Sequence, residues 1–418
     1  MYFKSIDIKN FKAVDEMRIE FRPGVNLLTG DNGVGKTAIL EAMIVALGGF
    51  FSGIKGVSAQ GILQTDVRFA KKSLAGASSN IQYFHPTSID TVIDCGQESY
   101  DCLRVRNDET GASKTRTDAK RLSGYATQLV NNPQSELPLL SYHSTARVTS
   151  FRREDFGTAK KNKLDDRRCG YIGCLDSSKD IKSIKEWCLK MELAEYHKMT
   201  KIPEYEAFKD TVSTVMQKMN EMKERPQIYY SRELEDLVYN ERGEELPIKY
   251  LSAGYQSLLW MTMDMAFRLA LLNPEHPDQR TAEGIVLIDE IDMHLHPKWQ
   301  WRILGVLEET FPKMQFIVAT HSPIIISSCK NGNLIRIDEN QKILYLSDAY
   351  AYSVEDVLEF RQGSSGVIKE VRNMYSEFEE ALNNDDVNKA SAILDDMTEK
   401  FGADNTEVKI ARAELEVY

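Results

Sequence analysis

Apolar and polar residues alternate in short runs at the start of the chain. The runs 2–8, 17–21 and 25–29 are separated by polar residues and by Pro23-Gly24. Alternation with a period of two is typical of half-buried strands. From Thr37 the apolar positions follow helical spacing until Gly48-Gly49. The pattern therefore predicts a strand meander whose last strand leads directly into a glycine-rich loop and a helix.

Two later runs of strand length are continuously apolar. They cover 284–289 and 315–320, and a helical pattern lies between them at 297–307. Continuous apolar runs indicate strands buried on both faces, and the succession of strand, helix and strand is typical of a parallel sheet. We therefore expect an α/β fold with a mixed sheet, whose core is parallel and whose N-terminal strands are antiparallel.

The pattern divides the rest of the chain into an insertion and a tail. Between 56 and 239 short strand-like runs alternate with polar loops, and helices broken at Pro203 cover 180–223. After Asp348 two amphipathic stripes predict helices behind a hinge at 363–366. We expect a head formed by 1–55 and 240–348, an insertion at 56–239 with its own helical subdomain, and C-terminal helices at 349–418.

Charge and cysteine content narrow the class of protein. The formal charge is −11, and residues 353–418 hold 7 Lys and Arg against 16 Asp and Glu, a difference of −9. This balance argues against a dedicated nucleic-acid binder and makes the tail a candidate docking surface. Six cysteines without a CxxC pair favour a reducing cytoplasm. The most apolar stretch contains Asp264 and Arg268, so we expect a cytoplasmic protein without a membrane segment.

The glycine-rich loop carries the first chemical signal. The segment 30–37 matches GxxxxGK[ST] between a strand and a helix, a context in which backbone amides wrap phosphate oxygens. Lys36 is expected to reach the β and γ phosphates, and the Thr37 hydroxyl to bind Mg²⁺. The residues assigned to nucleotide binding here are Gly30, Asn32, Gly33, Val34, Gly35, Lys36, Thr37 and Ala38.

Acidic and imidazole groups follow the two buried strands. Asp289 ends the run 284–289 and Glu290 follows it, beside the expected place of the phosphate loop. We assign Asp289 to Mg²⁺ and Glu290 to activation of the attacking water as general base. His321 follows the next strand, where it can hydrogen-bond a γ-phosphate oxygen. Lys36, Glu290 and His321 are the predicted catalytic residues.

A second anion-binding helix start lies at 251–256, with the sequence LSAGYQ, before a long apolar helix. Ser252 is expected near the N-cap, with backbone amides that point outward. The first loop is already expected to bind the triphosphate of its own chain. A second γ-phosphate site on the same chain is therefore expected to bind the nucleotide of a partner chain. Ser252, Gly254 and Gln256 therefore predict a head-to-tail pair of chains with two ATP between them.

The order of glycine loop, LSxGxQ, strand-Asp-Glu and strand-Thr-His resembles the ABC ATPase superfamily. The segments 288–297 (IDEIDMHLHP) and 319–323 (ATHSP) are similar to RecF/SMC-like ATPases without transporter partners. Within these, the short insertion and helical tail resemble the PtuA-like ATPases of Septu and retron-associated antiphage systems. The signature segment of this superfamily corresponds to 252–256, which reads Ser-Ala-Gly-Tyr-Gln where the family has Ser-Gly-Gly-Gln. Histidines at 294 and 296 stand where the D-loop acid of the family is expected. Both departures concern the rate of hydrolysis.

The resemblance implies further contacts and a partner. It assigns adenine contacts to Asn10, Phe11 and Lys12, and we nominate Gln64 for the loop that senses Mg²⁺. About 95 residues follow His321 without an HNH cluster. The resemblance therefore implies an ATPase that regulates a separate, PtuB-like HNH nuclease in antiphage defence.

Other functions compete with this interpretation. Basic stretches at 114–121 and 147–168 fit either a DNA or RNA backbone or ordinary solvated loops. A RecF-like repair ATPase that grips DNA is one alternative, and a slowly hydrolysing nucleotide latch is another. A transporter ATPase fits least, because 288–297 differs from the transporter form. Zinc at His294 and His296 lacks a third ligand in the sequence.

Overall fold

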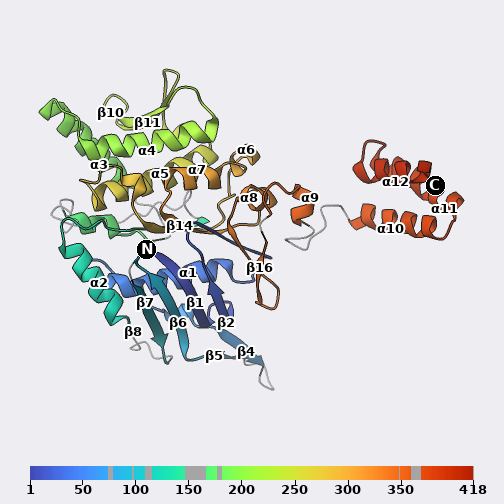
Figure 1. The fold of residues 1–418 in the computed structure, drawn as a ribbon, viewed down its shortest axis with the longest axis horizontal. Coiled ribbons are helices and arrows are strands. Elements are labelled where there is room, and N and C mark those ends of the chain that lie inside the picture. Colours follow the sequence, from blue (N-terminus) through green and yellow to red (C-terminus); the bar gives the residue numbers. More distant parts are fainter. Residues whose placement is uncertain are drawn as a thin grey trace. The chain divides into compact units, whose positions relative to one another are not determined.

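The computed structural model describes residues 1–73, 79–96, 98–108, 115–145, 166–176, 181–347, 349–358 and 369–417. The chain forms two compact units, Met1–Ala351 and Tyr352–Tyr418 (Figure 1). The predicted hinge at 363–366 and most of the basic stretch 147–168 lie outside the described residues, as does Lys114. The predicted boundaries of head, insertion and tail stay predictions.

A six-stranded sheet forms the centre of the first unit. Its strand order is β16-β15-β3-β14-β13-β9, and only the edge strand β16 runs antiparallel to its neighbour. The strands β9, β13 and β14 are buried along their whole length, as expected for a parallel sheet covered on both faces. The bounds are β3 Val25–Gly30, β9 Leu139–His143, β13 Gly284–Ile288, β14 Met314–Ala319, β15 Asn333–Ile337 and β16 Ile343–Leu346.

A second, antiparallel sheet contains the N-terminal strands. Its order is β2-β1-β6-β7-β8, and the bounds are β1 Tyr2–Phe11, β2 Val14–Glu20, β6 Thr87–Asp94, β7 Ser99–Arg106 and β8 Arg116–Asp118. Helix α1 (Lys36–Phe51) lies between the two sheets, in contact with strands of both. Because α1 is covered on both sides, it is apolar around nearly its whole circumference.

Helix α5 (Ala253–Leu272) covers the other face of the central sheet, where it packs on β9 (Figure 1). Helices α3 (Ile181–Lys198) and α4 (Pro203–Asn220) pack on α5, together with a small sheet of β10 (Gln227–Ser231), β11 (Asp236–Glu241) and β12 (Glu244–Pro247). The charges that argued against a membrane helix form a buried ion pair, in which Arg268 Nη2 lies 3.0 Å from Asp264 Oδ1. Among the described residues, no helix is long and apolar enough to cross a membrane.

Short elements connect these layers. The stretch 56–239 contributes β9 to the central sheet and β6, β7 and β8 to the antiparallel sheet, so its strands belong to both sheets. The remaining elements of this unit are η1 Gln64–Asp66, β4 Phe69–Ser73, β5 Ser79–Tyr83, α2 Lys120–Asn131, η3 Arg167–Tyr171, η4 Ile248–Tyr250, η5 Gln279–Thr281, α6 Pro297–Gln300, α7 Ile303–Thr310 and α8 Pro323–Ser328.

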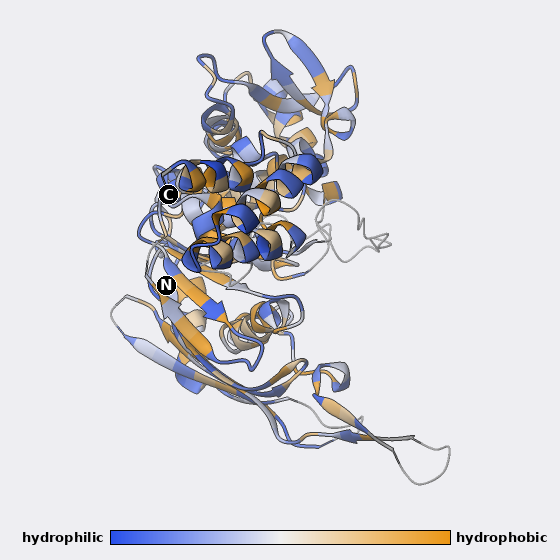
Figure 2. Ribbon diagram, turned by 90° about the vertical axis from the view of Figure 1, so that its right-hand side faces the viewer, coloured by the Kyte–Doolittle hydropathy of each residue, from blue (hydrophilic) through white to orange (hydrophobic). Residues whose placement is uncertain are grey.

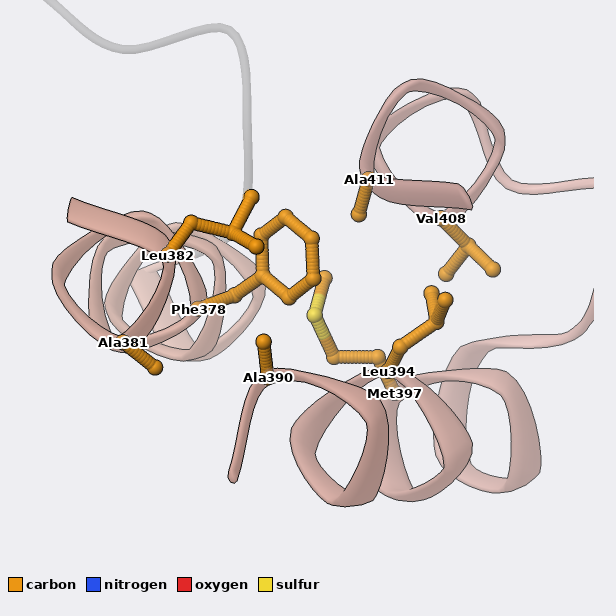
Figure 3. Close-up of a cluster of buried hydrophobic side chains, with 8 residues drawn as sticks. All are labelled: Phe378, Ala381, Leu382, Ala390, Leu394, Met397, Val408 and Ala411. Atoms are coloured by element: carbon orange, nitrogen blue, oxygen red, sulfur yellow. The ribbon is translucent and has the colours of Figure 1, made fainter. Parts of the chain in front are cut away.

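The second unit is a helical module with its own core. It holds α9 (Val354–Asp356), α10 (Lys369–Asn383), α11 (Val387–Phe401) and α12 (Thr406–Val417). Figure 2 shows hydrophilic and hydrophobic residues mixed along the tail helices, as amphipathic helices require. Figure 3 shows the buried cluster that they share, which consists of Phe378, Ala381, Leu382, Ala390, Leu394, Met397, Val408 and Ala411.

The predicted α/β fold is confirmed in its main features. The central sheet has a parallel core, and Pro203 begins α4 as the first helical residue. The three predicted N-terminal strands are present, but they form no single meander, because β1 and β2 lie in the antiparallel sheet and β3 lies in the central sheet. The tail stripes at 371–382 and 390–397 lie on α10 and α11. All six cysteines are thiols outside any disulfide.

Candidate nucleotide-binding site

The phosphate loop joins β3 to α1 at the carboxyl edge of the central sheet. Gly30 has φ 141°, and a Cβ there would lie 2.3 Å from the carbonyl oxygen of Ile337 on β15. Only glycine allows this close approach of two backbones. Gly35 is the N-cap of α1 and has no side chain that could cap the first amides. The helix start is therefore shaped to receive an anion.

Lys36 is the charged group of this loop. Its Nζ donates to the carbonyl oxygens of Gly30 and Asp31 at 2.8 and 2.9 Å, so the side chain folds back along the loop. Burial lowers the pKa of Lys36 to about 8, and the nearby carboxylates of Asp289 and Asp31 oppose that shift. A phosphate in the loop would offer the ammonium group a stronger partner than two neutral carbonyl oxygens.

Thr37 joins the phosphate loop to the end of β13. Its hydroxyl donates to Oδ2 of Asp289 at 2.9 Å. Asp289 is almost completely buried, and its backbone amide donates to the carbonyl oxygen of His143 at the end of β9. Mg²⁺ prefers hard oxygen ligands, often one or two protein groups together with phosphate and water. The converging hydroxyl and carboxylate oxygens fit this ion.

Glu290 begins the turn that leaves β13. It has φ 44°, a left-handed conformation that is uncommon for a residue with a side chain. The amide of Ile291 donates to the carbonyl oxygen of Ala319, which ties this turn to the end of β14. Such a backbone directs Glu290 differently from the buried Asp289 before it. Strained residues of this kind concentrate at functional sites.

His321 lies directly after β14 and shares an electrostatic environment with the loop. Its pKa is lowered by burial and by the positive charge of Lys36, while the carboxylates of Asp292 and Glu290 raise it. The preceding Thr320 is completely buried and its hydroxyl donates to Asp292. The ends of β13 and β14 are therefore linked beside His321.

The LSAGYQ segment forms the N-terminus of α5. Ser252 is the N-cap and its Oγ accepts from the Tyr255 amide at 3.5 Å, which confirms the predicted cap. Ser252 and Ala253 are exposed. The Gln256 side chain turns back and donates to the carbonyl oxygens of Lys249 and Leu251 at 3.1 and 2.7 Å. Gln256 thus braces the segment that precedes the helix.

Two groups of predicted contacts lie on other elements. Gln64 is in η1, and its side-chain oxygen accepts from Arg106 Nη2 at 3.1 Å. Lys12 forms ion pairs with Glu41 of α1 and with Asp66. Phe11 is fully buried, backbone and side chain alike, and its role also stays a prediction. The roles of Asn10, Lys12 and Gln64 stay predictions.

A family model described as AAA domain matches residues 5–237, more than half of the chain. The chain belongs to this AAA domain family. A second model, described as AAA ATPase domain, matches residues 176–326, which include β13 and the LSAGYQ segment. The site thus lies in segments that this AAA protein shares with ATPases.

Curated relatives cover most of this AAA protein. It is 25% identical to the Retron Vc95 probable ATPase of Vibrio cholerae serotype O1 biovar El Tor, over 80% of this chain and 73% of that protein. It is 24% identical to the Retron Ec83 probable ATPase of Escherichia coli, over 98% and 86%. It is 25% identical to the Septu protein PtuA of Bacillus thuringiensis, over 93% and 91%. The resemblance to Septu and retron ATPases is confirmed.

Solved structures agree on the fold. The SmcHead bound to the C-winged helix domain of ScpA matches with a TM-score of 0.51 and 17% identity, over 83% of this chain and 98% of that one. At this identity the likeness concerns the fold alone. The AAA protein therefore has the fold of an SMC-type ATPase head.

The structure also shows residues near the site that the sequence motifs did not indicate. Asn220 at the end of α4 accepts hydrogen bonds from Tyr255 and from Trp299. Ser141 on β9 donates to the buried Asp264 at 3.0 Å. Neither belongs to a spaced motif. The nearest sequence signal is the pair of charges at 264 and 268 inside an apolar helix, which predicts buried polar partners.

Proposed function

We propose that the protein binds and hydrolyses ATP in the cytoplasm, at two composite sites that form when two copies pair head to tail. One observation carries the proposal. The Thr37 hydroxyl and the Asp289 carboxylate lie 2.9 Å apart, although they come from segments 252 residues apart in the sequence. This contact unites the phosphate loop with the acidic strand end, as an Mg²⁺-dependent nucleotide site requires.

The residues of one chain divide the chemistry among them. Lys36 would leave the carbonyl oxygens of its loop and neutralise the β and γ phosphates, and Thr37 and Asp289 would hold Mg²⁺. When bound, Mg²⁺ neutralises the charge that develops on the phosphates. Glu290 accepts a proton from the attacking water. His321, whose pKa is lowered, is largely neutral near pH 7 and donates a hydrogen bond to a γ-phosphate oxygen.

The exposed N-terminus of α5 completes the site of the second copy. Ser252 and Ala253 face outward, and the amides of the first turn together with the positive end of the helix dipole suit a γ-phosphate. We call α5, which begins in the LSAGYQ segment, the signature helix. Each nucleotide is then held by the phosphate loop of one chain and by the signature helix of the other. This arrangement makes hydrolysis depend on association.

We further propose that the ATP state controls a separate HNH nuclease of the PtuB-like kind in antiphage defence. The names of the relatives support this assignment, because they belong to retron and Septu systems. The unit 352–418 is the proposed docking surface, since it has its own core and lies within the strongly acidic end of the chain. Deletion of this unit should abolish co-purification of the nuclease and leave ATP turnover unchanged.

Light-scattering mass with ATP and Mg²⁺ tests the shared site. We compare wild type with Glu290→Gln, which keeps the size of the side chain and removes the base. The variant should bind nucleotide, lose about 10²- to 10⁴-fold in turnover and accumulate a larger assembly. Lys36→Met is the control that should neither bind nor assemble. A monomeric mass for both wild type and Glu290→Gln, with and without ATP, would contradict the head-to-tail pair.

A further inference from the structure

The side chain of Asn220 connects helix α4 to the signature helix α5 and to helix α6. Asn220 is the last residue of α4, and its Oδ1 accepts from Trp299 Nε1 at 3.1 Å and from the Tyr255 hydroxyl at 3.3 Å. Its Nδ2 donates to the carbonyl oxygen of Met216 at 3.2 Å. Because an indole nitrogen can only donate, the atom that faces Trp299 must be the amide oxygen. All hydrogen-bonding atoms of this amide therefore have defined roles.

Ring packing makes the same joint rigid. The ring centroids of Tyr255 and Trp299 lie 4.7 Å apart with an interplanar angle of 59°. Tyr239 on β11 packs against Tyr255 from another side, with centroids 5.9 Å apart. Trp299 is 8% exposed, so little room is left for the indole to move. Aromatic pairs of this kind add directional preference to simple burial.

The signature glycine lies at this joint as well. A Cβ on Gly254 would lie 2.6 Å from the carbonyl oxygen of His294 and 4.0 Å from Trp299 Cζ3. His294 has φ 66° and belongs to the turn that begins at Glu290. The signature helix, the turn after Glu290 and helix α6 therefore meet at one place, and Asn220 contacts two of these segments through a single oxygen.

The end of α4 is fixed to the segment after Trp299 by further contacts. Arg302 Nη1 donates to the carbonyl oxygen of Met219 at 3.1 Å, and Arg302 Nη2 pairs with Glu221 at 2.6 Å. Thus Met219, Asn220 and Glu221 all bind residues 299–302. Glu221 and Arg302 also line a groove of about 810 Å³ between α4 and α7. Helix α4 consequently forms a firm base for the signature helix.

We propose that Asn220 is a positioning residue for hydrolysis, whose amide oxygen fixes the signature helix relative to helix α6, which follows the turn that carries Glu290. This inference rests on the proposed composite site. Compared with Ser-Gly-Gly-Gln, the segment has Tyr255 as an additional residue between Gly254 and Gln256. The hydroxyl and ring of Tyr255 supply the contacts to Asn220 and Trp299. Tyr255 thus has a structural role on the side of the helix that packs against Asn220 and Trp299, while Ser252 and Ala253 remain exposed.

Two substitutions of equal size separate positioning from folding. Asn220→Asp keeps the oxygen that both donors need and loses only the donor to the Met216 carbonyl oxygen, whereas Asn220→Leu removes both. We expect turnover at saturating ATP to fall about tenfold or more in Asn220→Leu, because small misplacements of catalytic groups are costly, and to fall clearly less in Asn220→Asp. Affinity for ATP, measured with a fluorescent analogue, should change by no more than about twofold in both, since the phosphate loop is untouched. Tyr255→Phe, which keeps the ring, should fall between wild type and Asn220→Leu.

The outcomes distinguish this inference from the function on which it rests. If Glu290→Gln assembles with ATP as expected but Asn220→Leu turns over like wild type, the positioning role is wrong and the shared site stands. If Asn220→Leu loses ATP affinity in step with turnover, or Asn220→Asp is as defective as Asn220→Leu, Asn220 is merely structural. If Glu290→Gln shows no nucleotide-dependent assembly, both inferences fail together.

Discussion

The phosphate loop and the signature helix present anion-binding helix starts in opposite ways. The loop is closed on itself, because Lys36 donates to its own backbone and Thr37 donates to Asp289. The signature helix packs at Gly254 against His294 and Trp299, while Ser252 and Ala253 are exposed. The difference supports the proposal that the loop binds nucleotide within one chain and that the helix acts on the nucleotide of another. Changes in the loop should therefore alter binding, and changes in the helix should alter turnover.

The largest expected separation of the two effects comes from Gly254→Ala. Its added methyl group would lie 2.6 Å from the carbonyl oxygen of His294, so either the signature helix or the turn must move. We expect turnover to fall about 10²-fold, as for a displacement of roughly 1 Å at a catalytic site. Affinity for ATP should stay within about twofold in an equilibrium titration, because Lys36 and Thr37 keep their contacts.

Gly305→Ala is the matched control. Gly305 also lies in a helix, but a Cβ there meets nothing within 4 Å. It should turn over like wild type and gain up to about 1 kcal/mol in free energy of unfolding, because alanine favours a helix over glycine. Equal turnover in both glycine variants would contradict the role of the signature helix.

Thr37→Ala should give the next largest effect on the ATPase reaction, and this change lies in the phosphate loop rather than in the signature helix. Loss of the hydroxyl removes one proposed Mg²⁺ ligand and the hydrogen bond to Asp289. The Mg²⁺ concentration for half-maximal turnover should rise at least about tenfold, similar to the loss when metal-site partners are removed. A Mg²⁺ titration at fixed ATP measures this, and Thr37→Ser, which keeps the hydroxyl, should restore it. An unchanged Mg²⁺ requirement in Thr37→Ala would remove Thr37 from the metal site.

The two regions also differ in how far the sequence could predict them. The strand, loop and helix around Lys36 are contiguous, so apolar spacing and a motif suffice to predict both the elements and the chemistry. Asp289 and Glu290 follow a buried strand, and because the strands are parallel, the carboxyl end of that strand lies at the same edge of the sheet as the phosphate loop. Asn220, Tyr255 and Trp299 come from separate segments that meet only through tertiary packing, and no local pattern records such a contact.

Long-range pairing explains the other differences from expectation. The pairing of β1 with β6 joins residues 2–9 to residues 88–94, and β9 enters the central sheet from within a stretch of weak periodicity. The motif places Gln256 at the signature, but its side chain faces the preceding segment because two carbonyl oxygens there need a donor. Which side chain turns inward depends on packing that spacing cannot indicate.

Ser141→Ala should affect both regions equally and least. Ser141 lies on β9, and its hydroxyl donates to Asp264 of the signature helix at 3.0 Å, while the carbonyl oxygen of His143 at the end of the same strand accepts from the Asp289 amide. The strand therefore supports the loop side and the helix side together. Loss of a hydrogen bond to a buried carboxylate should lower the free energy of unfolding by about 1.5–3 kcal/mol. The loss should not be larger, because Asp264 keeps its ion pair with Arg268. Denaturant unfolding measures this loss. The ratio of turnover to ATP affinity should match wild type, and a selective loss of turnover would mean that this network acts on the signature helix alone.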